Sequence, residues 1–292
     1  MTTATTTTAT TTTDECPIDG TLRGDTHDQS LTTGWEAGVP IDDTLVRRYL
    51  FHWAAYCDAY AAAAGGATTR TDAWAAADLR RPSGYFNSAT LLQPPGEDLD
   101  EQLDEIDSFF EPGAGEVLLW SIWPTPDLRP RGWQLVGHPP LLVRPPASVQ
   151  PPPAAPDVDV TEVLTPEQLA VWERVAIEGY PMPELEGARP GELADPSLLD
   201  DPRFGFWIGH HEGTPVSIGT TFVEHGIASF ALAVTRPEAR RLRHWHGHAV
   251  ARLRHNPDVW TTGVFSDDSR PGAERIGFVP IERFTLWSRA RP

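Results

Sequence analysis

The chain has 292 residues, of which 40% are hydrophobic, and this length allows about two globular domains with buried cores. Its formal charge of −18 argues against nucleic acids and anionic membranes as partners, because their phosphates would be repelled. With two cysteines and no apolar run long enough to span a bilayer, the sequence excludes a disulfide framework and a membrane protein and favours the reducing cytoplasm. Arginine supplies every cationic side chain other than histidine, which excludes a lysine nucleophile or Schiff base.

The first half of the chain is predicted to begin with a disordered tail and to continue as a helix and short strands. Residues 1–34 are rich in threonine and have no hydrophobic periodicity, as expected of a disordered tail. Asp42 or Asp43 can cap a helix whose apolar residues recur every three to four positions as far as residues 65–66. The elements predicted next are a strand at 85–93, an acidic amphipathic helix at 99–110, a buried strand at 115–121 and an extended stretch at 132–143.

A cluster of prolines divides the chain into two halves of similar length. It runs from Pro145 to Pro156 and cannot lie inside a helix or a sheet, so residues 146–156 are predicted to form a stiff linker. This places an N-terminal domain at 35–145 and a C-terminal domain at 157–292.

The second half has clearer signals for its elements. A helix is predicted from Pro166 to Gly179, because Thr165 is typical of an N-cap and Gln168 completes a capping box. A loop rich in proline and acidic residues follows to about residue 203. The elements predicted after it are a hairpin of 203–211 and 215–225, a third strand at 227–234, a helix within 237–256, a strand at 261–266, a helical turn at 272–276 and a strand at 278–288 that closes the sheet.

An internal repeat supports the division into two halves. Sliding the sequence by 145 residues places identical or similar side chains on one another without a gap. This favours a duplication of one domain. The matched pairs are Ser121/Ser266, Gly132/Gly277, Leu141/Leu286, Arg144/Arg289, Leu119/Val264, Trp120/Phe265, Trp133/Phe278 and Val136/Ile281.

Three short motifs and the order of the elements resemble the GNAT superfamily of N-acetyltransferases. The motifs are VTRPEAR at 234–240, Ser266 with Asp267, and ERIGF at 274–278. The resemblance covers about residues 160–290, and the first half is similar to a truncated copy, as in tandem GNAT proteins. It implies an α/β (α+β) fold with a mixed central sheet flanked by helices, and transfer of an acyl group from acetyl-CoA to the amine of a small molecule.

The resemblance also implies where the cofactor would bind. In GNAT proteins the third strand separates from the fifth, the acyl-CoA lies between them, and its pyrophosphate rests on the amides of an [RQ]-x-x-G-x-[GA] loop at a helix start. An ungapped alignment from Arg240 places Arg243 and Trp245 where the loop needs glycine or alanine, so we expect weak or undetectable binding of acetyl-CoA. The implied cofactor-binding residues are Leu232, Ala233, Val234, Arg240, Arg241, Arg243, His244 and Trp245.

Two alternatives stay open for this loop. A shifted alignment over residues 244–249 supplies Gly247 and Ala249, but it loses the leading Arg or Gln and needs an insertion after Pro237. The arginines could also attract the anion at longer range, or could form ion pairs with acidic residues of the same chain.

Catalytic and acceptor-binding residues are less clearly marked. The tyrosine that often serves as general acid in the family is replaced by Ala273, and the third strand has no acidic residue or histidine to act as a base. Ser266 and Asp267 remain as catalytic candidates, although they could instead cap the turn that follows. Residues 180–184 lie where GNAT proteins build the acceptor site, so Tyr180, Met182 and Glu184 are candidate substrate-binding residues, with a packed proline-rich loop as the alternative.

No metal site is predicted, and two functions remain open. His244 and His248 have the helical spacing of zinc ligands, but no cysteine or carboxylate motif nearby completes the site. The first function is an acyl-CoA-dependent N-acetyltransferase. The second is a GNAT-fold protein without cofactor chemistry that acts as a binding or scaffold subunit or as a repurposed enzyme.

Overall fold

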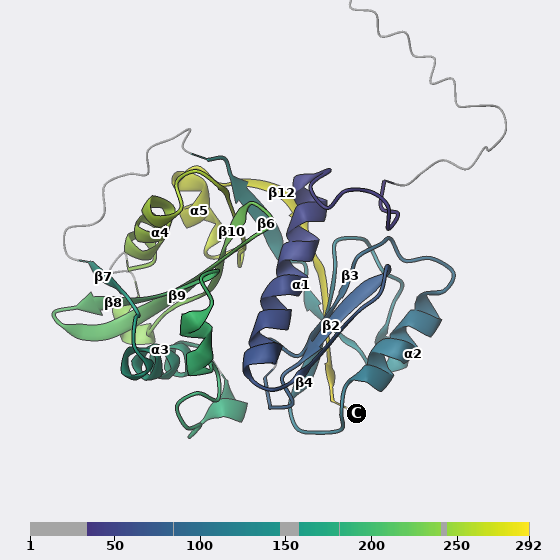
Figure 1. The fold of residues 1–292 in the computed structure, drawn as a ribbon, viewed down its shortest axis with the longest axis horizontal. Helices are drawn as coiled ribbons and strands as arrows, with labels where there is room; N and C mark the ends of the chain where they lie inside the picture. The colour runs from purple at the N-terminus through teal and green to yellow at the C-terminus, as the bar shows by residue number, and fades with distance from the viewer. Residues whose placement is uncertain (1–33, 84, 147–157, 181, 241–243, 292) are drawn as a thin grey trace, which may run out of the picture. The chain divides into compact units, whose positions relative to one another are not determined.

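A computed structural model describes residues 34–83, 85–146, 158–180, 182–240 and 244–291, and in these ranges the chain forms two mixed sheets with helices on their faces (Figure 1). Apart from Gly34 and Pro146, the predicted tail and linker lie outside the described residues, as do Arg241 and Arg243. The first sheet has the strand order β1-β2-β3-β4-β13-β5, and the second has the order β12-β6-β11-β10-β9-β8-β7. The predicted mixed α/β architecture is confirmed.

The strands are β1 (Ala67–Arg70), β2 (Trp74–Asp78), β3 (Ser88–Leu91), β4 (Glu116–Ser121), β5 (Gln134–Gly137), β6 (Pro140–Arg144), β7 (Asp159–Glu162), β8 (Phe204–His211), β9 (Thr214–Glu224), β10 (Ile227–Thr235), β11 (Trp260–Val264), β12 (Val279–Arg283) and β13 (Thr285–Ala290). The helices are α1 (Leu45–Ala63), α2 (Leu99–Phe109), α3 (Pro166–Gly179), α4 (His244–His255) and α5 (Arg270–Arg275), with short 3-10 helices η1 (Arg129–Arg131), η2 (Pro183–Leu185), η3 (Pro196–Asp200) and η4 (Pro237–Ala239).

Helix α1 lies between the two sheets and packs against both (Figure 1). It begins after Thr44, whose side chain accepts a hydrogen bond from Arg47 N, so neither Asp42 nor Asp43 is the N-cap that the sequence suggested. Tyr56 shows how the helix joins the core: its ring contacts Phe86 of the first half and Phe222 of the second. A helix that is apolar on most of its circumference is expected where both sides are buried.

The two halves exchange their last strands. β6 belongs to the first half of the sequence but pairs with β11 and β12 in the second sheet. β13 closes the second half of the sequence but pairs with β4 and β5 in the first sheet. The predicted single extended elements at 132–143 and 278–288 are therefore wrong, because each is two strands in different sheets. The chain crosses between sheets at Pro139 and Phe284, where Phe284 N donates to Pro139 O at 3.0 Å.

Strands β1, β2 and β7 were not predicted. β2 contains three consecutive alanines, which have low strand propensity, yet it is fully buried between two paired strands. β1 and β7 are each four residues long and lie at the edges of their sheets, where pairing with one neighbour fixes them.

The predicted repeat corresponds to equivalent elements of the structure. Adding 145 to the numbers of Leu99, Gln134 and Pro140 gives His244, Val279 and Thr285, which are the first residues of α4, β12 and β13. α2 packs on the first sheet as α4 packs on the second. The two halves are therefore arranged in tandem.

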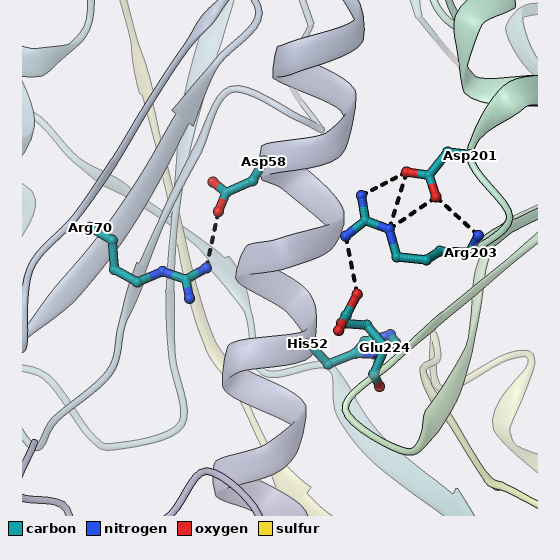
Figure 2. Close-up of polar contacts among 6 residues, drawn as sticks. All are labelled: His52, Asp58, Arg70, Asp201, Arg203 and Glu224. Carbon is teal, nitrogen blue, oxygen red and sulfur yellow. Dashed lines mark hydrogen bonds and ion pairs between the residues drawn. The ribbon is translucent and has the colours of Figure 1, made fainter. Parts of the chain in front are cut away.

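Figure 2 shows polar contacts around α1, of which the one between His52 and Glu224 joins the two halves, while the ion pairs of Arg70 and Arg203 lie within one half each. His52 of α1 donates from Nδ1 to Glu224 O of β9 at 3.0 Å, and burial lowers the pKa of His52 to about 4, so its ring is neutral. Arg203 binds Asp201 and also Glu224, with 3.1 Å between Nη1 and Oε2 of the latter. Near the C-terminus, Arg291 forms a buried ion pair of 2.7 Å with Asp78, the last residue of β2.

Candidate functional site

Strands β10 and β11 separate in the middle of the second sheet and leave a cavity of about 350 Å³. They pair in parallel over three residues, from Ile227 with Trp260 to Ser229 with Thr262. Both Phe230, which follows on β10, and Val264 at the end of β11 line the cavity. We call this space the β10–β11 cavity.

A bulge in β10 forms part of the cavity wall. Ala231 pairs with Thr220 and Val234 with Ile218, so Leu232 and Ala233 face the single residue Gly219 of β9. Leu232 has a φ of 38°, in the left-handed region that a leucine seldom adopts. A bulge removes residues from the regular ladder and redirects their backbone and side chains, and bulges are common beside functional sites. Of the three strand residues implied as cofactor contacts, Leu232 and Ala233 line the cavity, whereas Val234 packs closely against Gly179.

Aromatic side chains of the first half close the cavity on its other side. Tyr49 and Trp53 come from α1, Tyr85 from the turn before β3, and Trp120 from β4. The Trp53 ring lies 4.8 Å from that of Trp120 and 5.6 Å from that of Tyr85, measured between centroids. Sequence analysis missed these residues, because no local pattern shows that an element of the first half reaches the site of the second.

The three candidate acceptor residues are not brought together. Tyr180 lines the β10–β11 cavity and its hydroxyl donates to Ala233 O at 2.9 Å, while burial raises the pKa of Tyr180 to about 12. Met182 is half-buried against the core. Glu184 is exposed and lines a different cavity with Arg80 and Arg189.

A second cavity, of about 760 Å³, lies at the start of α4 and is called here the outer cavity. Trp245 and Ser266 line both cavities, so they stand at the boundary between them. The Trp245 ring packs 6.2 Å from that of Phe265, and a Cβ added to Gly272 would lie 3.2 Å from it. Arg240 also lines the outer cavity, but its guanidinium donates to Thr235 O and Gly179 O, each at 3.3 Å.

The shifted alignment of the cofactor loop does not fit the structure. Residues 244–249 already belong to α4, where Gly247 and Ala249 are buried. A Cβ on Gly247 would lie 2.5 Å from Val158 Cγ1, so packing against the strand β7 region explains this glycine. His244 is also buried, beside His211, and burial lowers its pKa. In the ungapped alignment from Arg240, the last two residues of the loop motif, His244 and Trp245, lie at the start of α4.

Ser266 and Asp267, the two catalytic candidates, have different surroundings. Ser266 Oγ accepts a hydrogen bond from Ser269 N at 3.2 Å, as capping residues do, while it also lines both cavities. Asp267 is exposed and forms an ion pair of 3.0 Å with Arg283 of β12. Ala273, at the position of the missing tyrosine, is buried in α5.

Arg252 of α4 is a cavity residue that sequence analysis missed. It is 1% exposed, and its guanidinium carbon lies 3.9 Å from the centroid of Phe230. Burial lowers the pKa of Arg252 to about 9, which still leaves a cation at neutral pH. One helical turn earlier, His248 bonds Ser217 Oγ through Nε2 at 2.8 Å, and burial together with the Arg252 charge lowers its pKa to about 3. The sequence does contain a signal for this residue. Arg252 lies three residues after Ala249 and next to Leu253, which places it on the apolar face of the helix.

Neither a metal cluster nor a membrane helix is found in the described ranges. No group of three or more His, Cys, Asp or Glu side chains there has the arrangement of a metal site. Within the same residues, each helix is too short or too polar to span a bilayer.

Solved structures with a similar fold include proteins described as GNAT acetyltransferases. A GCN5-related N-acetyltransferase from Kribbella flavida matches 82% of this chain and 95% of its own, with a TM-score of 0.56 at 17% identity. A functionally unknown conserved protein from Staphylococcus epidermidis ATCC 12228 matches 77% of this chain and 93% of its own, with a TM-score of 0.54 at 14% identity.

A GNAT-family protein from Novosphingobium aromaticivorans DSM 12444 matches 76% of this chain and 89% of its own, with a TM-score of 0.50 at 13% identity. No protein-family model and no curated protein match the sequence. Each of these structures covers more of the chain than either half contains. The chain therefore has the GNAT N-acetyltransferase fold, repeated in tandem, with the last strands of the two copies exchanged.

Proposed function

We propose that the chain transfers an acyl group from an acyl-CoA to the amine of a small molecule, in the β10–β11 cavity. The observation that supports this most is the separation of β10 from β11 near the bulge, which leaves a cavity lined by both strands. The outer cavity adjoins it at Trp245 and Ser266 and gives a path from the surface at the start of α4.

The described residues fit the acyl end of such a cofactor better than its phosphates. The space between the strands has a mostly apolar lining that suits an acyl group. At the outer end, Trp245 occupies the first turn of α4, and Arg240 is already bonded to two carbonyl oxygens. Phosphates bind at helix starts through bare backbone amides, so we expect weak binding of the nucleotide part.

Acyl-CoA would supply a thioester, whose carbon forms a bond to the amine nitrogen as its bond to sulfur breaks. The amine must lose a proton and the sulfur must gain one, so a neutral donor in the cavity would assist. Tyr180 is such a donor, because burial keeps its phenol protonated and its hydroxyl is held at Ala233 O of the bulge. Ser266 lines the same cavity, but its Oγ is hydrogen-bonded to Ser269 N in the turn before α5.

The second candidate is a GNAT-fold protein that binds a small molecule without acyl transfer. The indole of Trp245 and the internal hydrogen bonds of Arg240 favour it, because both reduce the surface available to phosphates.

Calorimetric titration of the full chain with acetyl-CoA, followed by measurement of thiol release with a panel of small amines, separates the two. The acyltransferase requires saturable binding at a stoichiometry of one and amine-dependent release of thiol. Tyr180→Phe should then lower kcat by roughly tenfold or more and leave KM little changed, since a proton donor acts in the transition state. No binding of acetyl-CoA at millimolar concentration, together with no thiol release, would leave the second candidate.

A further inference from the structure

The β10–β11 cavity contains a buried cation that the fold does not neutralise. Within the described part of the chain, no carboxylate forms an ion pair with Arg252, and its Nη2 has no hydrogen-bond partner. The other two nitrogens donate to backbone oxygens: Nη1 to Thr220 O at 3.1 Å and Nε to His248 O at 3.3 Å. A buried charge is costly unless an opposite charge or several hydrogen bonds compensate it, so a counter-ion is expected.

The neighbours of Arg252 are arranged to admit the guanidinium and offer no opposite charge. A Cβ on Gly219, the residue facing the bulge, would lie 3.0 Å from Arg252 Cζ, so glycine at this position leaves room for the side chain. His248 is neutral because its pKa is lowered to about 3, and the Tyr180 phenol is neutral because its pKa is raised to about 12. Phe230 covers one face of the guanidinium.

Other buried groups that line the same cavity also lack partners, and each can donate a hydrogen bond. They are Trp53 Nε1, Trp120 Nε1 and Ser229 Oγ, which have no partner within the described residues. An indole N–H can only donate, and a guanidinium can only donate. The cavity therefore presents one positive charge and several donors, which is the complement of an anion with more than one acceptor oxygen.

We propose that the β10–β11 cavity binds a carboxylate group of a small organic ligand, with Arg252 as its counter-ion. A carboxylate matches the planar fork of a guanidinium and accepts further hydrogen bonds on its remaining lone pairs. The carboxylate could belong to the acyl group, as in a dicarboxylic acyl thioester, or to the amine acceptor, as in an amino acid. The proposal deepens the proposed function by using the same cavity, but carboxylate binding itself does not require acyl-CoA.

The first test uses free ligands and the full chain, so it stands even if acyl-CoA does not bind. Succinate and glycine are titrated by calorimetry against succinamide and glycinamide, in which an amide replaces each carboxylate. At least one acid should bind about tenfold to a hundredfold more tightly than its amide, the range expected for charged hydrogen bonds. Equal binding of acids and amides, or no binding of any of them, overturns the proposal.

Variants then locate the effect at Arg252. Arg252→Met removes the charge at similar length, and Arg254→Met is the matched control, because Arg254 is exposed on the same helix. The preference for acids should disappear in the first variant and persist in the second. If Arg252→Met does not fold, Trp120→Phe, which removes one of the unpartnered donors, should weaken acid binding severalfold while leaving amide binding unchanged. Retention of the acid preference in both Arg252→Met and Trp120→Phe would show that the carboxylate binds elsewhere.

Coenzyme thioesters identify the source of the carboxylate. Tighter binding of succinyl-CoA than of acetyl-CoA, lost in Arg252→Met, assigns the carboxylate to the acyl group. Equal binding of the two thioesters together with Arg252-dependent binding of glycine assigns it to the acceptor. Failure of both thioesters to bind counts against the proposed function alone and leaves the result with free acids as the test of the carboxylate site.

Discussion

Helices α2 and α4 occupy equivalent places in the two halves but carry opposite charges. α2 has Asp100 and Glu101 in its first turn, whereas the first turn of α4 has no acidic residue. Acidic side chains stabilise a helix start but repel an anionic ligand there. The start of α4 can therefore accept an anion more readily than the start of α2.

Near the ends of these two helices, the contrast in charge concerns one pair of equivalent residues. Adding 145 to the number of Asp107 gives Arg252. Asp107 binds Arg289 of the exchanged strand β13, with 2.6 Å between Oδ2 and Nη1, whereas Arg252 has no acidic partner among the described residues. The residue at this position forms an ion pair that holds strand β13 in the first half, whereas in the second half it lines the β10–β11 cavity.

The first half therefore serves as a wall of the second half's cavity. Trp120 of β4 is equivalent to Phe265 after β11, and both line the β10–β11 cavity from their separate sheets. The exchange of β6 and β13 fixes the halves so that Trp120 and Trp53 reach the cavity.

We expect the largest effect on folding when the chain is cut at the linker and the two halves are separated from each other. A fragment of residues 157–292 lacks β6, which lies between β11 and β12, and exposes the apolar face of β13. We expect this fragment alone to aggregate, because unpaired strands and apolar surface promote association. Cleavage of the intact protein at an inserted protease site should leave both fragments in one complex on size-exclusion chromatography. Separation into two folded monomers would contradict the exchange.

The ion pair between Asp78 and Arg291 should contribute more to stability than ion pairs at the surface. Its side chains are 1% and 3% exposed, and Arg291 follows the exchanged strand β13. Asp78→Ala leaves a buried charge without its partner, and we expect a loss of about 3–5 kcal/mol in the free energy of unfolding. Asp267→Ala breaks the exposed pair with Arg283 and should cost less than about 1 kcal/mol.

Urea denaturation of the two variants checks this difference. A loss at Asp78 no larger than the loss at Asp267 would show that the end of the exchanged strand is not what joins the halves.

Asp107 and Arg252 should respond differently to removal of their charges. Asp107→Ala leaves Arg289, which is 17% exposed, without its partner, so we expect a loss of about 1–3 kcal/mol. Arg252→Met replaces an uncompensated buried cation by an apolar chain of similar length and should leave stability unchanged or raise it. Thermal unfolding without added ligand measures both. A large destabilisation by Arg252→Met would mean that the guanidinium serves mainly to hold α4 on β9.

Sequence patterns revealed the local parts of this fold but not the exchange. The capping box of Thr165 and Gln168 predicted the start of α3, and the structure has both of its hydrogen bonds. The 145-residue offset predicted the tandem arrangement, which the equivalent starts of α4, β12 and β13 confirm. Which sheet a strand joins depends on packing around Phe284 and Pro139, and hydrophobic periodicity carries no information about it.

In the candidate site, too, sequence motifs predicted the local parts but not the residues that packing brings in. Family-like motifs led to the strand β10 and the start of α4, where Leu232, Ala233 and Trp245 line the cavity. Arg252 lines the cavity but lies two turns into the helix, outside any motif. Tyr49 and Trp53 come from a helix about 180 residues earlier, and their role depends on α1 packing between the sheets.

Replacement of Trp245 is expected to have the smallest effect, and it tests whether the start of α4 can accept phosphates. Pyrophosphate must approach backbone N–H groups to about 3 Å to form hydrogen bonds, and a helix start adds roughly half a positive charge. Trp245 is the second residue of α4, and its ring lies between the two cavities against Phe265 and Gly272. Trp245→Ala should therefore tighten acetyl-CoA binding by about threefold to tenfold, since about 1 kcal/mol of steric hindrance is removed. Arg254→Ala, at an exposed position of the same helix that lines neither cavity, is the control and should leave the Kd unchanged. Calorimetry measures both, with thermal unfolding to confirm that each variant is folded. Weaker binding in Trp245→Ala alone would mean that the indole is a surface on which the coenzyme packs, and the expectation of a blocked helix start would then be wrong.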